Sequence, residues 1–144
     1  MGQAAGPAGV VIDASVALTW CFTEEATPAT EAVLDSLRDH PVVVPSLWFL
    51  ELSNALSIAE RKRRIAPAKS KDFATLIGSL DVEVDHESAE RAFTELLPLS
   101  RAHALTSYDA AYLDLANRRS LPLATLDDPL RKAAAKLGVE LLGR

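Results

Sequence analysis

Short apolar runs alternate with longer segments of helical periodicity along most of this chain. The apolar runs are VVID (10–13), VVV (42–44), DVEV (81–84), LPLA (121–124) and VELL (139–142). Helical periodicity is found over 15–21, 28–39, 46–63, 67–79, 86–103, 107–119 and 129–137. Strands separated by helices favour parallel pairing, with helices on both faces of the sheet. The pattern therefore predicts an α/β fold built on a mainly parallel sheet of five strands.

Prolines and one glycine mark several of the predicted helix ends. Pro67 and Pro129 suit a first helical turn, where the missing N–H has no partner to lose. Gly138 suits a helix C-terminus. Pro98 falls inside a helical pattern, so we expect a kink or break there.

Length and composition suit a globular protein. The chain has 144 residues, enough for one domain, and 24% of them are charged. We expect a flexible N-terminus over 1–9 (MGQAAGPAG), without the features of a signal peptide, and a single domain over 10–144. No apolar run approaches the roughly 20 residues that span a membrane. The lone Cys21 favours a reducing compartment, so we expect a cytoplasmic protein.

The net charge is −5, from 15 basic and 20 acidic residues. A passive nucleic-acid binder usually has a surplus of basic residues, so the balance argues against that class. An acidic surplus is compatible with carboxylates gathered around a divalent cation.

Two acids follow predicted strands, where parallel α/β proteins place their functional groups. Asp13 ends the first strand and Asp127 follows the fourth. Capping is the alternative for Asp13, since Asp13 or Ser15 can cap the next helix. Asp128 precedes Pro129, so we predict Asp128 as N-cap and Pro129 as the first helical residue, which leaves Asp127 for a site.

Two further acids lie on predicted helices. Glu51 shares a helix face with Leu47, Asn54 and Ile58, and we take Ser46 as the N-cap of that helix. A carboxylate in an apolar stripe is costly unless it is paired or metal-bound, although a rotated stripe would leave Glu51 solvated. Asp109 stands in a first turn, where Thr106 and Asp109 also fit a capping box.

The four acids together predict a cation site. Carboxylates that are brought together repel and raise one another's pKa. A hard cation such as Mg²⁺ removes that repulsion and prefers oxygen ligands. Such a site suits phosphodiester hydrolysis, because a bound metal lowers the pKa of water and stabilises a leaving oxygen.

Four segments carry a resemblance that covers about Val10 to Leu142. VIDASVALTWCFTEE, ELSNAL, LTSYDAAYLDLA and LATLDDPLRKAAAKLGVELL resemble, in order and spacing, the motifs of PIN-domain proteins of the VapC toxin type. Ala104 is a departure, since relatives often have glycine there; it concerns a helix ending and none of the acids.

The resemblance implies a three-layer α/β/α sandwich and an endoribonuclease that depends on Mg²⁺ or Mn²⁺. It implies a cognate antitoxin, an RNA substrate and a homodimer as partners. The metal and catalytic positions fall on Asp13, Glu51, Asp109 and Asp127. The accompanying hydroxyl and amide positions fall on Ser15, Asn54 and Thr125, which we expect to orient ligands or water.

Three alternatives stay open. A catalytically silent PIN module would bind RNA or a protein partner without cleavage. A DNA-directed nuclease is possible because a carboxylate–Mg²⁺ site does not recognise the 2′-hydroxyl. A receiver-like phosphate acceptor would need a lysine after a late strand, where this chain has Leu126-Asp127-Asp128-Pro129.

Basic and aromatic side chains have two interpretations. Arg61 to Arg64, and the pair Arg118 and Arg119, either contact RNA phosphates or form solvated helix ends that complement the dipole, which we favour. Trp20, Phe22, Trp48 and Phe49 either stack on bases or, as we favour, pack in the core or an interface.

Overall fold

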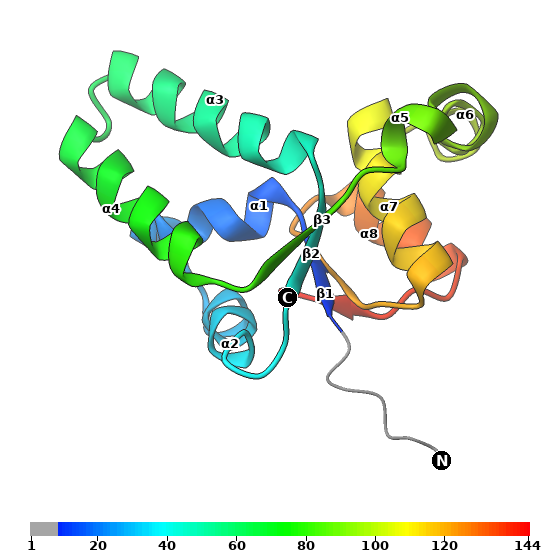
Figure 1. The fold of residues 1–144 in the computed structure, drawn as a ribbon, viewed down its shortest axis with the longest axis horizontal. Helices are drawn as coiled ribbons and strands as arrows, with labels where there is room; N and C mark the ends of the chain where they lie inside the picture. Colours follow the sequence, from blue (N-terminus) through cyan, green and yellow to red (C-terminus); the bar gives the residue numbers. More distant parts are fainter. Residues whose placement is uncertain (1–8) are drawn as a thin grey trace.

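A parallel sheet runs through the centre of the computed structural model, which describes residues 9–144 (Figure 1). The predicted flexible segment 1–9 therefore lies outside the described residues except for Gly9. The sheet has the order β3-β2-β1-β4-β5, and every neighbouring pair is parallel. Its strands are β1 (Val10–Ile12), β2 (Val42–Pro45), β3 (Val82–Asp85), β4 (Leu123–Ala124) and β5 (Leu141–Leu142). The predicted five-stranded parallel sheet is confirmed, with β4 and β5 shorter than the apolar runs suggested.

Helices cover both faces of this sheet, as the sandwich architecture requires (Figure 1). The chain moves from β1 to β3 in one direction along the sheet, so right-handed crossovers put the intervening helices on one face. These are α1 (Ala14–Ala17), α2 (Pro28–Ser36), α3 (Leu47–Arg61) and α4 (Pro67–Ser79), with 3₁₀ turns η1 (Leu18–Trp20) and η2 (Thr23–Glu25). The chain then moves the opposite way, and the other face carries α5 (Ser88–Arg91), η3 (Ala92–Leu96), α6 (Leu97–His103), α7 (Ser107–Arg119) and α8 (Asp128–Lys136).

The direction of the chain reverses between β1 and β4, which makes their carboxyl ends the switch point of the sheet. These two strands pair through Val11–Leu123 and Ile12–Ala124. Their connections leave toward opposite faces of the sheet. A ligand site in an open α/β fold lies at such a switch point, and Asp13 and Asp127 follow the two strands concerned.

The long helix predicted over 86–103 is interrupted before Pro98. The chain forms α5, then the π-helical turn η3, and then α6, in whose first turn Pro98 lies. Proline lacks an N–H, so it is tolerated there and not deeper in a helix. Ala104 ends α6 in the left-handed conformation, with φ 53° and ψ 44°. The helix therefore ends at Ala104, although a left-handed alanine costs about 1–2 kcal/mol.

The core lies between the sheet and the helices on both of its faces. Trp48 and Tyr112 are its largest fully buried side chains. Phe22 is buried and Phe49 is 41% exposed, so most of the predicted core role of the aromatics holds. Within residues 9–144, none of the helices combines the length and apolar character needed to cross a membrane.

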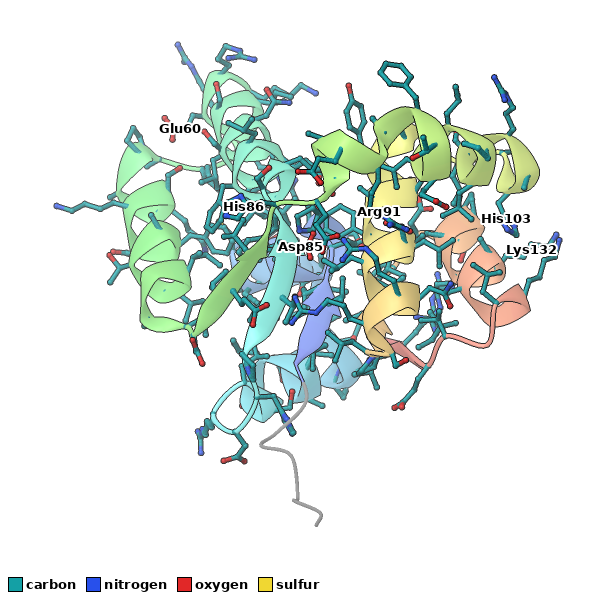
Figure 2. The ribbon with its side chains drawn as sticks, turned by 45° about the vertical axis from the view of Figure 1, so that its right-hand side comes forward. Glu60, Asp85, His86, Arg91, His103 and Lys132 are labelled. Carbon is teal, nitrogen blue, oxygen red and sulfur yellow. The ribbon has the colours of Figure 1, made fainter. Side chains whose placement is uncertain are left out.

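An ionic cluster joins β3, α5 and α7 at one edge of the molecule. Asp114 is buried and accepts from Arg91 Nε at 2.8 Å and from Arg118 Nε at 3.2 Å. Arg118 also donates to both carboxylate oxygens of Asp85, at 2.7 and 3.0 Å. Figure 2 shows Asp85 and Arg91 directed into this region from β3 and from α5. Arg119 pairs with Glu83 at 2.6 Å.

Neither of the two roles considered for Arg118, an RNA phosphate contact or a solvated helix end, describes its side chain, which is only 17% exposed. It is not a solvated helix end, and its guanidinium is already occupied by carboxylates. The basic character of this pair therefore serves packing of α7 against β3, which the linear sequence did not reveal.

Candidate active site

Asp13 sits at the end of β1, buried to 4% exposure. Its Oδ1 accepts from Ser15 Oγ at 2.6 Å and from Val16 N at 3.3 Å, so it does cap α1. Its Oδ2 accepts from Thr125 Oγ1 at 2.5 Å. The capping and the functional interpretations of Asp13 are thus compatible, since one carboxylate accepts both from α1 and from Thr125, which follows β4.

Ser15 and Thr125 fasten the loop after β4 to the carboxylate of Asp13. Leu126 N donates to Ser15 Oγ at 2.9 Å, and Asp127 N donates to Thr125 Oγ1 at 3.0 Å. Each hydroxyl therefore donates to Asp13 and accepts from this loop. Two of the three residues expected to orient ligands or water therefore contact Asp13, and their role in doing so stays a prediction.

Asp127, and not Asp128, is the N-cap of α8, which corrects the sequence prediction. Its Oδ2 accepts from Leu130 N at 2.9 Å, and α8 begins at Asp128 with Pro129 in its first turn. The prediction was wrong by one residue because the first N–H groups of a helix all lack partners, so proline fits there at more than one position. The cap fixes the backbone and one oxygen of Asp127 beside Asp13.

Glu51 is half-buried near the start of α3. The hydroxyl of Tyr112 donates to its Oε1. The buried stripe of α3 is Trp48, Leu52 and Ala59, so the face predicted through Glu51 lies at the edge of the stripe. Ser46 precedes α3 but makes no capping hydrogen bond. Asn54 is exposed, and no hydrogen bond within residues 9–144 joins it to the acids.

Asp109 occupies the first turn of α7. Its backbone N–H donates to Thr106 Oγ1 at 3.0 Å, so the predicted N-cap at Thr106 is confirmed. The side chain of Asp109 is half-buried.

Each of the four acids is linked electrostatically to at least one other, which indicates that they share one region. Burial raises the pKa of Asp13; hydrogen bonds from Ser15, Thr125 and Val16 lower it in part, and the charge of Asp127 raises it further. Burial also raises the pKa of Asp109, and the charges of Asp127 and Asp13 add to the rise.

Glu51 belongs to the same group. Burial raises the pKa of Glu51, the hydrogen bond from Tyr112 opposes this, and the charges of Asp109 and Asp13 raise it. Every charged group that shifts the pKa of Asp13, Asp109 or Glu51 is a carboxylate. This group of acids is therefore negative, and within residues 9–144 no side-chain cation contributes to these pKa shifts.

This donor set fits a hard divalent cation, for which Asp13, Glu51, Asp109 and Asp127 would supply oxygen ligands. As the side chains stand, no three His, Cys, Asp or Glu residues within 9–144 converge closely enough to form a ligand shell. The acids are coupled through space but not closed into a cage, as expected of carboxylates that repel one another.

Sequence reasoning missed two residues that shape this pocket. Tyr112 lies one turn after Asp109 on the same face of α7, a spacing that could have drawn attention to it. Arg131 Nη1 donates to the carbonyl oxygens of Thr125 and Leu142, at 2.8 and 2.9 Å. It thereby holds β4 and β5 together below the acids, and no local pattern marks this role.

Fold and site together define an open, parallel α/β protein with carboxylates gathered at the carboxyl edge of its sheet. A family model described as PIN domain matches residues 10–136. The match covers most of the chain, so this protein belongs to the PIN domain family.

Solved structures share the fold at low sequence identity. PAE2754 from Pyrobaculum aerophilum has a TM-score of 0.69 and 22% identity, over 93% of this chain and 83% of that one. VapBC2 from Rickettsia felis, bound to a DNA fragment from its promoter, has a TM-score of 0.63 and 12% identity, over 92% and 96%. FitAcB from Neisseria gonorrhoeae has a TM-score of 0.60 and 17% identity, over 92% and 95%. A comparison with curated proteins finds no match.

Proposed function

We propose that this protein is an endoribonuclease toxin that depends on Mg²⁺ or Mn²⁺ and is neutralised by a cognate antitoxin. One observation supports the proposal: the charges of Asp13, Asp109 and Asp127 raise the pKa of other acids in the set, so Asp13, Glu51, Asp109 and Asp127 lie near one another at the switch point of the sheet. PIN domains are in general metal-dependent nucleases, and VapBC2 and FitAcB share this fold.

Asp13 and Asp109 would hold the principal cation, and Glu51 and Asp127 would complete the site directly or through water. A bound divalent cation supplies Lewis acidity and lowers the pKa of water, which suits phosphodiester hydrolysis. The chain prepares the pocket for this. Ser15 and Thr125 fix the carboxylate plane of Asp13. We assign Asn54, which is exposed near Glu51 on α3, to orienting water or substrate.

The partner surface of this proposal is an apolar groove between α3 and α4. It has a volume of about 640 Å³ and is lined by Phe49, Leu56, Phe73 and Ile77, among others. Leu50, at 74% exposure, lies on the same helix. An antitoxin segment with apolar side chains would cover this surface. The homodimer and the cytoplasmic location stay predictions from the family resemblance and from the lone cysteine.

Parallel digestion of RNA and DNA tests the function. We expect the purified protein to cleave single-stranded RNA in Mn²⁺ or Mg²⁺, to leave 5′-phosphate and 3′-hydroxyl ends, and to be inactive in EDTA. Product ends can be assigned by mass spectrometry. Cleavage of DNA at a comparable rate would favour the DNA-directed nuclease, and no cleavage of either would favour the silent binding module.

Removal of the Tyr112 hydroxyl should weaken the site without unfolding the protein. In Tyr112→Phe the ring stays in the core, but Glu51 loses the donor that orients it and lowers its pKa. We expect a 10- to 100-fold loss of cleavage or Mn²⁺ affinity, typical when a group supporting a metal ligand is removed. Calorimetric Mn²⁺ titration and a pH profile shifted upward would report it.

Tyr108→Phe is the matched control, because Tyr108 lies on the same helix and is 64% exposed. Equal behaviour of the two variants would remove Tyr112 from the site.

A further inference from the structure

A second cleft, distinct from the antitoxin groove, lies between the end of α6 and the outer face of α8. Its volume is about 550 Å³, and its lining includes Arg101, His103, Asp128, Lys132 and Lys136. Figure 2 shows His103 from α6 and Lys132 from α8 near each other at this edge. Basic groups thus predominate here, in a protein whose net charge is −5.

The cations of this cleft are available to a ligand. Within residues 9–144, Arg101, Lys132 and Lys136 are exposed and take part in no ion pair. The single acid of the cleft, Asp128, already accepts from Arg144 Nη1 at 2.5 Å. By contrast, Arg91 and Arg118 elsewhere in the molecule are occupied by carboxylates.

Both walls of the cleft lead directly to the acid pocket. On the α8 side, Asp128 follows Asp127, the N-cap of the helix. On the α6 side, Ala104 lines the cleft and Thr106 caps α7, whose first turn carries Asp109. Asp109 and Asp127 stand within a few residues of the lining residues Ala104 and Asp128. A nucleic-acid strand that lies in the cleft would therefore pass close to both acids.

Helix dipoles explain only part of this arrangement. Arg101 and His103 stand in the last turn of α6 and Lys136 in the last turn of α8, where cations are favoured in any protein. Lys132 lies one turn earlier in α8 and has no such explanation. Lys132 and Lys136 are four residues apart, so their side chains share one face of α8.

We propose that this α6–α8 cleft binds the phosphate backbone of the RNA strand beside the scissile bond, with Lys132 and Lys136 as its principal contacts. The inference rests on the proposed nuclease function and extends it by naming the substrate-binding surface. Exposed lysines on one face supply the sequence-independent, salt-dependent attraction that RNA phosphates need. They also lie beside a negative pocket that would otherwise repel the strand.

RNA binding by Lys132→Gln/Lys136→Gln tests the proposal. A short fluorescein-labelled single-stranded RNA of mixed sequence is titrated by anisotropy in Mn²⁺, on the Asp13→Asn background so that turnover does not interfere. We expect affinity to fall on the order of 10-fold at low salt. The slope of log affinity against log salt should fall by about 1.4, since each single-strand phosphate contact contributes about 0.7. In the nuclease-competent background KM should rise, with kcat unchanged.

Lys69→Gln/Lys71→Gln is the matched control. It removes the same charge from exposed lysines of α4, on the opposite side of the molecule from α8 (Figure 1). Affinity within 2-fold of the parent is expected; this bound is about the 0.5 kcal/mol of an ordinary surface substitution. Equal losses in the two double variants would reduce the effect to net charge and overturn the proposal.

Two further outcomes separate the cleft from the catalytic assignment. If the protein cleaves no RNA while its RNA affinity still depends on Lys132 and Lys136, the nuclease function fails and the cleft stands. If Lys132→Gln/Lys136→Gln binds RNA with unchanged affinity, the proposal that the cleft binds RNA is overturned, whether or not the protein cleaves RNA. Tighter binding of poly-L-glutamate than of RNA, lost in the same variant, would instead assign the cleft to an acidic protein segment.

Discussion

Asp13→Asn is expected to abolish cleavage while the fold persists. The carboxylate is the most buried of the four acids and would lose a metal-binding charge, so the loss should exceed the roughly 100-fold seen when only supporting groups are removed. Asparagine has nearly the same shape. With its carbonyl oxygen in the place of Oδ1 it still accepts from Ser15 Oγ and Val16 N, and its amide nitrogen, in the place of Oδ2, can donate to Thr125 Oγ1. The measurement is single-turnover RNA cleavage in Mn²⁺, beside circular dichroism to establish folding.

The difference in stability between this variant and the wild type, without metal, should depend on pH in a defined direction. Burial raises the pKa of Asp13 in the folded protein above the ordinary value of 3.8. The folded state then binds the proton more tightly than the unfolded state does, so the wild type loses stability as pH rises from 3.8 through the raised pKa. Asparagine does not ionise. Metal-free Asp13→Asn should therefore match or exceed the wild-type Tm at neutral pH, by a margin that closes in acid.

With Mn²⁺ bound, the wild type should have a higher Tm than Asp13→Asn, the reverse of the order expected without metal. At 100 times its Kd a ligand stabilises the folded state by about 2.7 kcal/mol, or about 5–10 °C in Tm for a chain of this size. We expect this shift in the wild type and in Asp35→Asn, an exposed acid of α2, and none in Asp13→Asn. Wild-type cleavage by Asp13→Asn would remove this residue from the mechanism.

Arg118→Met should cause the largest loss of stability among these variants. The guanidinium is the shared partner of Asp85 and Asp114, which are 7% and 8% exposed. Breaking a buried pair leaves charges without compensation and costs about 3–5 kcal/mol. Arg91 and Arg119 still reach the two acids, so the lower end of that range is expected, and Tm should fall by about 10 °C. Differential scanning calorimetry measures it.

Arg64→Met is the matched control, because Arg64 pairs with Glu24 and Glu25 at the exposed surface. Such pairs contribute little in water, so its Tm should barely change. Arg118 also holds the pKa of Asp85 below its ordinary value of 3.8. That stabilisation is present above pH 3.8 and is lost as pH falls through the depressed pKa. The Tm values of the wild type and of Arg118→Met should therefore converge in acid. Equal Tm values at neutral pH would contradict the role of Arg118.

Much of the fold could be predicted because strands and helices carry local periodic signals. The runs 10–12 and 42–44 are buried strands because every side chain in them is apolar, and Pro67 and Gly138 mark helix ends through their own backbone limits. The cap of α8 was misplaced because Asp127 and Asp128 are chemically equal before Pro129. The buried face of α3 was misjudged because Leu50 is as apolar as Leu52 yet is 74% exposed.

The sequence by itself determined the parallel α/β architecture and led to the prediction of the four acids, since apolar periodicity and motif order are properties of the linear chain. Only the tertiary structure decided what those residues meet. Tyr112 reaches Glu51 across 61 positions, and Thr125 reaches Asp13 across 112. Arg118 is bound within an ionic cluster, whereas Lys132 stays open to solvent. Such differences depend on distances between segments that are remote in sequence, and packing sets those distances.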